Sequence, residues 1–364
     1  MATPPLDCAV IVPVLNEVDN VEELTARVFA ALGPLEGEIL FIDDGSSDGT
    51  PDLVERIAAA DRRVRLVRRV GRRGLSSAVT EGFLSTIAPV VAVIDGDLQH
   101  DETILPQLVE AVASGGADLA VGTRYAGGGS VGEWAAARVR ISRFATRLSA
   151  GIMKTQLSDP MSGFFAIRRG LFLDIAPRLS QRGYKILLDI VASHPAPIAL
   201  AEVPYSFRTR VAGTSKLDGA VALQYGELLL DKLLGRILPV RLIMFGAIGL
   251  VGTVVHMALL WLGLAVAAFA FPVAQALATL GAMTFNYTLN NALTYRDRMR
   301  RGWGWIAGWA SFCAACSLGA FANVGISTLL FSDAWGWWLS GLAGAAIGSV
   351  WNYAATSWLT WRRR

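Results

Sequence analysis

Residues 90–99 read Val-Val-Ala-Val-Ile-Asp-Gly-Asp-Leu-Gln, a short apolar run that ends directly in two acidic residues and an amide. Similar β-rich runs recur along the first third of the chain and alternate with amphipathic stretches long enough to form crossover helices. The expected strands are residues 8–12, 38–42, 64–67, 90–94 and 118–122, and the expected helices are residues 21–32, 51–60, 74–86 and 104–114. This alternation predicts an α/β fold with a parallel sheet.

Polar residues follow four of these strands at the point where each strand ends. They are Asn16-Glu17, Asp43-Asp44, Asp95-Gly96-Asp97 and Thr123-Arg124. Parallel strands end at the same edge of a sheet, and α/β proteins bind their ligands at that edge. The side chains are therefore expected to form one site.

The segment Asp95-Gly96-Asp97-Leu98-Gln99 places two carboxylates and an amide oxygen on alternate positions. Side chains at alternate positions of an extended segment lie on one face, so these oxygens can converge on one ion. Oxygen ligands favour hard cations such as Mg²⁺ and Mn²⁺. We therefore expect a divalent metal bound by Asp95, Asp97 and Gln99. His100, the next residue, is interpreted as a structural residue behind these ligands.

The run from Asp43 to Thr50 has two compatible interpretations. It is rich in turn residues and ends in a helix N-cap. Its carboxylates also stand at the ligand-binding edge, where they can accept hydrogen bonds from a nucleobase or a ribose. We expect Asp44 to contact the base and Glu17 to contact the ribose, with Pro13 shaping the turn.

The second part of the chain has a different composition. The whole chain is 53% apolar, with a net charge of +3. Residues 1–239 carry 25 Lys/Arg and 28 Asp/Glu, whereas residues 240–364 carry 8 Lys/Arg and only 2 acidic residues. The positive charge of this apolar part indicates membrane orientation and not nucleic-acid binding. Three cysteines, all in apolar runs, favour reduced thiols over a disulfide framework.

Two amphipathic stretches precede the apolar part. Residues 133–153 place apolar side chains at steps of three and four with arginines elsewhere, and residues 220–238 form a second such stretch. The pattern is typical of helices that lie on a bilayer surface. A helix that faces a protein core gives the same pattern, and this alternative stays open for residues 133–153.

Four apolar runs follow Pro239, and each is near or above the roughly 20 residues needed to cross a bilayer. They span residues 242–264, 273–293, 305–330 and 337–359. The loop at 296–302 and the terminal residues 362–364 are basic, whereas the other two loops carry no Lys or Arg. The sequence therefore predicts four transmembrane helices, with the α/β domain and both termini in the cytoplasm.

The apolar part also contains an internal repeat. Phe285-Asn286-Tyr287 and Leu293-Thr294-Tyr295-Arg296 return 66 residues later as Trp351-Asn352-Tyr353 and Leu359-Thr360-Trp361-Arg362. This repeat predicts two helical hairpins in the same orientation. Asn286 and Asn352 are interpreted as hydrogen-bonding residues between helices, with contact to a lipid headgroup as the alternative.

Five motifs, taken in order, resemble the inverting family 2 glycosyltransferases with the GT-A fold. They are Val-Pro-Val-Leu-Asn-Glu (12–17), the run 43–50, the segment 95–99, Gly-Thr-Arg (122–124) and Asp-Pro-Met-Ser-Gly-Phe-Phe (159–165). Within that family they are most similar to dolichol- or polyprenyl-phosphate mannose synthases, and residues 240–364 resemble GtrA-like four-helix membrane domains. The implied organisation is a GT-A catalytic domain (1–218) that includes the helix at 133–153, a second interfacial helix with a linker (219–239), and a transmembrane domain (240–364).

The resemblance also implies roles for individual residues. The nucleotide-sugar would contact Pro13, Asn16, Glu17, Asp44, Asp95, Asp97, Arg208, Ser215 and Lys216. The acceptor phosphate would contact Arg124, Arg138 and Ser142, with Asp97 and Arg124 as the catalytic residues. Residues 209–212 depart from the commonest spelling of the family's donor-binding loop, which leaves the diphosphate contact open.

The implied reaction is the transfer of mannose from GDP-mannose to the phosphate of a polyprenyl lipid, with inversion at the anomeric carbon. A lipid phosphate is anionic near neutral pH, so it can attack without a strong general base when cations hold it in place. A UDP-sugar donor is the alternative among enzymes, and a non-catalytic lipid-carrier translocase or scaffold is a distant one. The expected partners are the donor, the lipid acceptor and the bilayer, with no nucleic acid. A homo-oligomer is left open.

Overall fold

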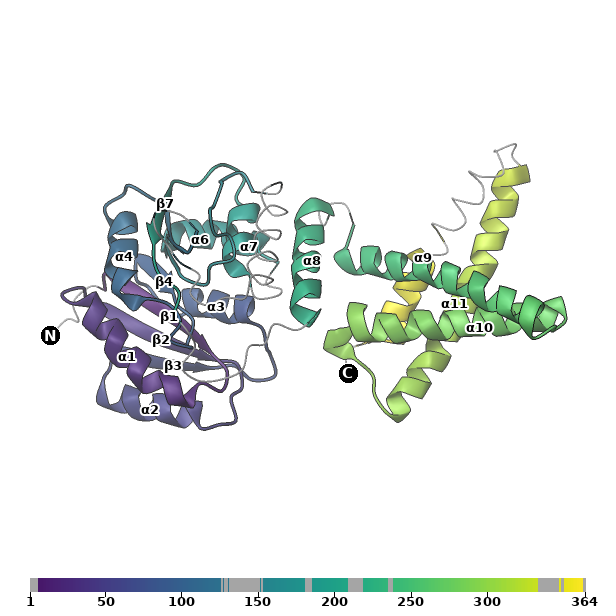
Figure 1. Ribbon diagram of the computed structural model, residues 1–364, viewed down its shortest axis with the longest axis horizontal. Coiled ribbons are helices and arrows are strands. Elements are labelled where there is room, and N and C mark those ends of the chain that lie inside the picture. Colours follow the sequence, from purple (N-terminus) through teal and green to yellow (C-terminus); the bar gives the residue numbers. More distant parts are fainter. Residues whose placement is uncertain are drawn as a thin grey trace. The chain divides into compact units, whose positions relative to one another are not determined.

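The computed structural model describes most of the chain. The described residues are 6–125, 127, 130, 151, 153–180, 185–208, 219–234, 238–332, 347 and 350–362. The chain divides into two compact units, Met1–Leu233 and Leu234–Arg364. The first unit contains a sheet with helices around it, and the second is helical (Figure 1).

The first unit is built on a mixed seven-stranded sheet with the order β3-β2-β1-β4-β6-β5-β7. The strands are β1 (Cys8–Val14), β2 (Gly37–Asp43), β3 (Val64–Arg68), β4 (Val90–Val93), β5 (Leu119–Thr123), β6 (Phe165–Arg168) and β7 (Leu200–Pro204). β6 runs antiparallel to both of its neighbours, and the other pairs are parallel. All five strands expected from the sequence are present, whereas β6 and β7 were not expected.

The antiparallel strand β6 leaves the ligand-binding edge intact. Two successive antiparallel pairings keep β4 and β5 parallel to each other, so β1, β2, β4 and β5 all end at one edge. The prediction that the polar strand ends share an edge is therefore confirmed. With only four residues, β6 is too short to show a periodic pattern in the sequence.

Helices cover both faces of the sheet and complete an α/β architecture of three layers. One face carries α1 (Val18–Leu32), α2 (Thr50–Ala60) and α4 (Leu105–Ala113), and the other carries α3 (Leu75–Leu84), α6 (Arg169–Ile175), α7 (Ile186–Ser193) and α8 (Gly219–Leu234). Short 3₁₀ turns lie at Glu102–Ile104 and Ala176–Arg178. The central strand β1 is apolar throughout because helices cover both of its faces. Val10 packs on the side of α1, α2 and α4, and Ile11 packs on the side of α3, α6 and α7.

The last helix of the first unit, α8, docks on α7 through a buried ion pair. Lys232 Nζ lies 2.5 Å from Asp189 Oδ1, and Asp189 is fully buried. The Asp189 carboxylate also accepts hydrogen bonds from the backbone N–H and hydroxyl of Ser180 and from the hydroxyl of Ser193. The compact first unit thus includes α8, although the sequence analysis placed residues 219–239 outside the catalytic domain.

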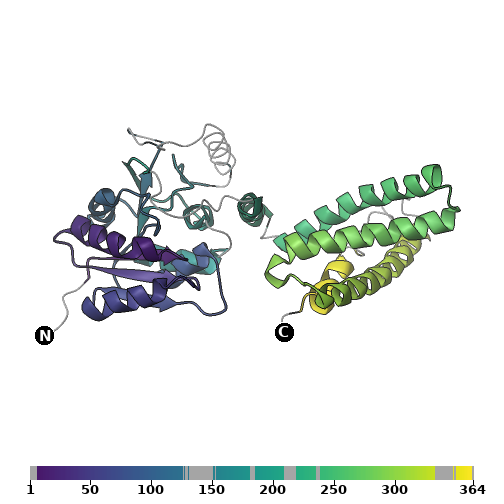
Figure 2. The same cartoon turned by 60° about the horizontal axis from the view of Figure 1, so that its bottom comes forward.

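The described part of the second unit consists of helices. Two of them, α9 (Val240–Trp261) and α10 (Phe271–Leu289), run side by side (Figures 1 and 2). α9 (Val240–Trp261) ends in a π-helical turn (Leu262–Val266), α10 (Phe271–Leu289) ends in another (Asn290–Thr294), and a 3₁₀ turn (Arg296–Arg298) leads to α11 (Trp303–Ser332). Residues 350–359 are also helical. Among the described residues, one helix, Val240–Val266, is long and apolar enough to cross a membrane. The number of spans stays a prediction, since much of the run 337–359 lies outside the described residues.

The internal repeat produces contacts that occur in reciprocal pairs. The equivalent residues Tyr295 and Trp361 stack with ring centroids 4.0 Å apart and an interplanar angle of 6°. The Tyr295 hydroxyl bonds to Ser357 Oγ, while Trp361 Nε1 donates to Asn291 Oδ1 at 3.2 Å. Asn291 and Ser357 are themselves 66 residues apart. The two copies of the repeat therefore offer the same positions to each other at these contacts, which is the contact pattern of a two-fold related pair.

The repeated asparagines do not make the predicted hydrogen bonds between helices in the described part of the chain. The amide oxygens of Asn286 and Asn352 are buried and have no hydrogen-bond partner there. Asn286 instead packs against α9, where a Cβ on Gly252 would lie 2.0 Å from its Oδ1. At this position the glycine allows close helix packing around a polar side chain.

Candidate active site

The loops after β1 and β2 are joined to each other at the carboxyl edge of the sheet. Asn16 has a φ of 57°, a left-handed conformation that asparagine tolerates better than most residues. Its N–H donates to Ser46 Oγ at 2.8 Å, and its Oδ1 accepts from the Ser47 N–H at 2.9 Å. The Glu17 N–H donates to Thr50 Oγ1 at 3.0 Å. The two loops expected to contact the nucleotide are therefore adjacent.

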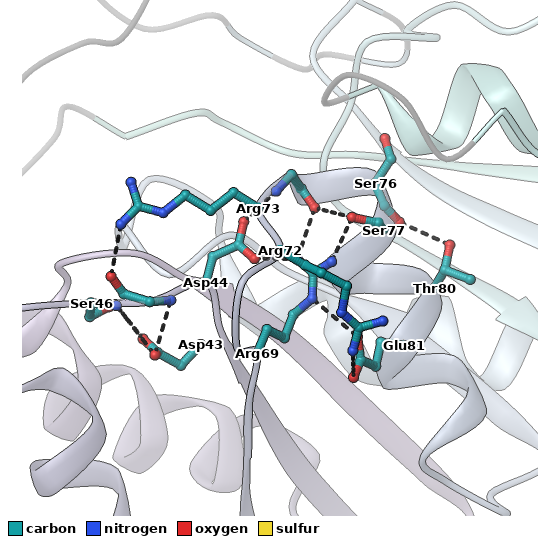
Figure 3. A network of polar contacts seen from close by, with 12 residues as sticks. Asp43, Asp44, Ser46, Arg69, Arg72, Arg73, Ser76, Ser77, Thr80 and Glu81 are labelled. Atoms are coloured by element: carbon teal, nitrogen blue, oxygen red, sulfur yellow. Dashed lines mark hydrogen bonds and ion pairs between the residues drawn. The ribbon is translucent and has the colours of Figure 1, made fainter. Parts of the chain in front are cut away.

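Asp44, at the end of β2, is held from two sides (Figure 3). Arg69 Nη1 contacts its Oδ1, and the Gly74 N–H donates to its Oδ2 at 2.6 Å. The Arg69 side chain is 1% exposed, and it also donates to Glu81 Oε2 at 3.1 Å and to Ser77 Oγ at 2.7 Å. Asp44 thus lies where a base contact was expected, with its orientation fixed by protein donors on both oxygens.

The neighbouring acidic residue, Asp43, has a different task. It is buried, and its carboxylate accepts hydrogen bonds from the backbone N–H groups of Gly45 and Ser46. This is the pattern of a turn stabilised by an aspartate. Arg73 reaches across the same turn from the loop after β3 and donates to Gly45 O at 3.1 Å (Figure 3).

Asp95, which follows β4, is hydrogen-bonded to His100, the residue that the sequence analysis interpreted as a structural residue behind the metal ligands. His100 Nε2 lies 3.1 Å from Asp95 Oδ2, and Nδ1 lies 2.7 Å from the Tyr205 hydroxyl. Burial acts to raise the pKa of Asp95, but the hydrogen bond with His100 and the electrostatic interactions with His100, Lys185 and Arg124 together lower it more, so the pKa lies below its usual value. The imidazole is buried among Phe164, Tyr205 and Phe207 and holds one orientation of the carboxylate.

The candidate metal ligands lie on a kinked loop, and the expectation of an extended segment was wrong. β4 ends at Val93, before the ligands begin. Leu98 has a φ of 58°, and the Gln99 N–H turns back to donate to Asp97 Oδ1 at 3.2 Å. A left-handed leucine is costly in a free chain and is found where the surrounding structure fixes it, often at functional sites.

Gln99 is paired with Arg208 through backbone and side chain. The Arg208 N–H donates to Gln99 O at 2.8 Å, and Gln99 Nε2 donates to Arg208 O at 3.1 Å. The Arg208 guanidinium donates to Glu102 Oε2 at 2.6 Å and to Asp101 Oδ1 at 2.8 Å. The side chain expected to contact the nucleotide-sugar therefore rests on two carboxylates in this structure.

Arg124, at the end of β5, forms a buried bidentate pair with Asp159. Its Nε lies 2.6 Å from Oδ2 and its Nη2 lies 2.9 Å from Oδ1, and Asp159 is fully buried. Burial acts to lower the pKa of Arg124, but Asp159 raises it more, so the pKa is above its ordinary value. The guanidinium carbon also lies 5.2 Å from the ring centroid of Phe207. Arg124 is thus a permanently charged, fixed cation at the site edge.

The remaining predicted site residues are placed as follows. Pro13 lies within β1, opposite Ile42 of β2. Arg138, Ser142, Ser215 and Lys216 lie outside the described residues, as does most of the predicted interfacial helix at 133–153.

Three site residues were missed by the sequence analysis. Arg69 and Asp159 hold Asp44 and Arg124, and the charge of Lys185 helps to lower the pKa of Asp95. Asp159 begins the motif at 159–165, which supported the family resemblance but in which no single residue was given a role. Its acidic side chain could have suggested a partner for an arginine of the site. Arg69 gave no such signal, because its pairing depends on β3 lying beside β2 in the sheet.

The oxygen atoms present fit a hard divalent cation. Two carboxylates, from Asp95 and Asp97, stand on the kinked loop with Gln99, whose amide nitrogen is engaged by Arg208 O and whose oxygen is left to bind a cation. No cluster of three or more His, Cys, Asp or Glu side chains suited to a metal occurs in the described ranges. A cation here would therefore take its further oxygens from a ligand or from water.

Comparison with known proteins identifies both units. The family model described as glycosyl transferase family 2 matches residues 9–175, and the model described as GtrA/DPMS, transmembrane domain, matches residues 244–361. Dolichol-phosphate mannosyltransferase of Pyrococcus furiosus is 32% identical over 361 residues, covering 97% of this chain and 99% of the relative.

Two further proteins are similar over about three fifths of the chain. Polyprenol monophosphomannose synthase of Mycolicibacterium smegmatis is 34% identical over 218 residues, covering 58% of this chain and 81% of the relative. The solved structure of glucosyl-3-phosphoglycerate synthase from Mycobacterium tuberculosis, in complex with Mn²⁺, UDP and phosphoglyceric acid, is 22% identical with a TM-score of 0.45. It covers 62% of this chain and 78% of that one.

Proposed function

This chain belongs to glycosyl transferase family 2, among the dolichol-phosphate mannosyltransferases with a GtrA/DPMS transmembrane domain, and we propose that it transfers mannose from GDP-mannose to a polyprenyl phosphate. The observation that carries this proposal is similarity to a relative of that name over 97% of the chain. The similarity spans both units, so it includes the membrane part as well as the catalytic part. The protein is therefore a membrane-associated glycosyltransferase.

The donor side of the proposed reaction is the edge formed by the loops after β1, β2 and β4. Asp44 would accept hydrogen bonds from the guanine, because the protein already fixes its orientation. Asn16 and Glu17, on the adjoining loop, would meet the ribose. Arg208, Ser215 and Lys216 were expected to contact the nucleotide-sugar by resemblance, and of these Arg208 is engaged by Asp101 and Glu102.

Asp95, Asp97 and Gln99 would hold Mg²⁺ or Mn²⁺ at this edge. The bound cation would neutralise charge that develops on the departing diphosphate. The protein's own contribution is orientation: His100 fixes the Asp95 carboxylate, and Arg208 O fixes the Gln99 amide. His100 contacts Asp95 Oδ2 and Arg208 O contacts Gln99 Nε2, so the cation would be bound by Asp95 Oδ1 and Gln99 Oε1.

On the acceptor side, a lipid phosphate oxygen would attack the anomeric carbon while the bond from that carbon to the diphosphate breaks, which inverts the configuration. The phosphate is already an anion and needs cations to hold it in line. Arg124 would supply one of them, held in a fixed orientation by its bidentate pair with Asp159. Arg138 and Ser142 would supply further contacts by resemblance.

The proposed location of the reaction is the cytoplasmic face of a membrane. The basic loop at 296–302 and the basic end at 362–364 support a cytoplasmic position for both termini and four spans in total. Residues 133–153 would lie at the bilayer surface, close to where a polyprenyl phosphate presents its headgroup.

The test is to offer the purified full-length protein a panel of GDP- and UDP-sugars with polyprenyl phosphate and Mn²⁺, and to weigh the lipid product by mass spectrometry. We expect one added hexose from GDP-mannose alone. Product formed only from a UDP-sugar would replace the donor assignment, and nucleotide binding without any lipid product would favour a non-catalytic carrier or scaffold.

A further inference from the structure

We propose that Arg208 is a positioning residue for the metal ligand Gln99, and that it acts through this ligand instead of touching the donor diphosphate. The inference rests on the proposed metal-dependent reaction. It differs from the role that the resemblance implied for Arg208, and it names a task for Asp101 and Glu102, which had none.

The first observation is that the backbone of Arg208 is hydrogen-bonded to both the carbonyl and the side-chain amide of Gln99. Its N–H donates to Gln99 O at 2.8 Å, and its carbonyl accepts from Gln99 Nε2 at 3.1 Å. A third contact comes from Nη1, which lies 3.5 Å from the carbonyl oxygen of the next residue, His100. The loop that carries the metal ligands is thus bonded to Arg208 at consecutive residues.

The second observation is that the Arg208 side chain is anchored. Its guanidinium spans two carboxylates, with Nη1 2.6 Å from Glu102 Oε2 and Nη2 2.8 Å from Asp101 Oδ1. The Glu102 side chain is only 8% exposed, and its other cation, Arg27, is 3.8 Å away. Moving Arg208 to a diphosphate would remove the near partner of a buried carboxylate, which is unfavourable.

The chemistry of the amide links these two observations to the metal. A glutamine presents an acceptor oxygen and a donor nitrogen on one rotatable group, and only the oxygen binds a cation. The Arg208 carbonyl accepts a hydrogen bond from the Gln99 amide nitrogen, and this orients the Gln99 amide oxygen toward the cation. Partners behind metal ligands typically change metal affinity about 10- to 100-fold when they are lost.

The experiment compares the metal-dependent part of GDP binding among variants of the full-length protein. The dissociation constant for GDP is measured by calorimetry in EDTA and again in Mn²⁺. The ratio of the two constants is the factor by which the metal strengthens GDP binding. Arg208→Ala and Glu102→Gln test the two ends of the anchor, and Arg208→Lys tests the fork geometry. Arg168→Ala is the matched control, because Arg168 is also an ion-paired arginine but stands at the opposite edge of the sheet.

We expect all four variants to bind GDP in EDTA within about twofold of the parent, which also shows that they fold. In the two Arg208 variants and in Glu102→Gln, the factor by which Mn²⁺ strengthens GDP binding should be about 10- to 100-fold smaller than in the parent. In Arg168→Ala this factor should be unchanged. With Gln99→Ala already present, Arg208→Ala and Glu102→Gln should have no further effect, because the two residues act through Gln99.

Two outcomes would overturn the inference alone. Arg208→Ala that weakens GDP binding tenfold or more in EDTA, while Glu102→Gln does not, would place Arg208 on the diphosphate. Full additivity with Gln99→Ala would show that Arg208 acts elsewhere. A parent protein whose GDP binding gains nothing from Mn²⁺ would overturn both the inference and the proposed metal dependence.

Discussion

Replacing Lys232 by Met tests how α8 is attached to the first unit. The substitution keeps an apolar stem of similar length but removes the ammonium that faces Asp189 at 2.5 Å. Asp189 is fully buried, so it would be left as an uncompensated charge in the core. We expect the first unit to lose stability and α8 to detach more readily.

The magnitude follows from the environment of the pair. Removing one partner of a buried ion pair costs about 3–5 kcal/mol. Asp189 would retain the hydrogen bonds from Ser180 and Ser193, which places the expected loss at the lower end, about 3 kcal/mol. For a unit of this size each kcal/mol lowers Tm by about 2–4 °C, so we expect a fall of roughly 6–12 °C.

The assay is thermal unfolding of the full-length protein in detergent, followed by tryptophan fluorescence and circular dichroism. The transition of the first unit is recognised by its shift when GDP and Mn²⁺ are added, because a ligand stabilises the unit that binds it. Asp231→Asn is the matched control, since Asp231 also lies near Lys232, at 4.0 Å, but is partly exposed.

A second variant separates charge from packing. Lys232→Met combined with Asp189→Asn leaves no unpaired charge and keeps an acceptor for the Ser180 N–H, so it should recover at least half of the lost Tm. If Lys232→Met alone unfolds within 2 °C of the parent, or if the double variant is less stable than the single one, the assigned role of the ion pair is wrong.

The other predictions concern the reaction. Asp97→Ala should abolish transfer while leaving the far-ultraviolet circular dichroism unchanged, and undiminished turnover in EDTA would refute the metal assignment. Arg124→Ala should stop transfer and also lower Tm, because it leaves Asp159 buried and unpaired, a loss of about 3–5 kcal/mol that calorimetry would detect. Arg138→Ala should raise the KM for polyprenyl phosphate at least tenfold with an unchanged donor Kd, and the reverse pattern would place it on the donor side. Truncation after Leu238 keeps the Lys232 anchor and should still glycosylate a short-chain acceptor, whereas a folded but inactive product would show that the membrane unit builds part of the site.

The edge of the sheet could be predicted from sequence because it depends on local patterns. Apolar runs, helix-length spacers and polar residues at strand ends are all visible along the chain, and parallel topology then brings those ends together. β7 was missed because its five residues end in Pro204 and lie at the edge of the sheet, where burial on both faces is incomplete. A half-buried strand ending in proline resembles a loop in sequence.

The partners of the site residues could not be predicted in the same way. Gln99 and Arg208 are 109 residues apart, and Arg124 and Asp159 are 35 apart, so no local pattern relates them. Arg69 adds a second reason, because arginine is normally placed on the surface and this one is 1% exposed. The sequence shows which chemical groups are available, and the fold decides which of them support the others.

The reciprocal contacts between the two copies of the repeat make this part of the membrane unit equivalent to a homodimer joined into one polypeptide. In a true homodimer a single gene position supplies both copies of each contact, so the two sides must change together. Fusion removes this constraint, and the sequence has used the freedom: Tyr295 faces Trp361, and Asn291 stands where the other copy has Ser357. One side of each contact can therefore change while the other side keeps its residue, which two identical subunits could not do.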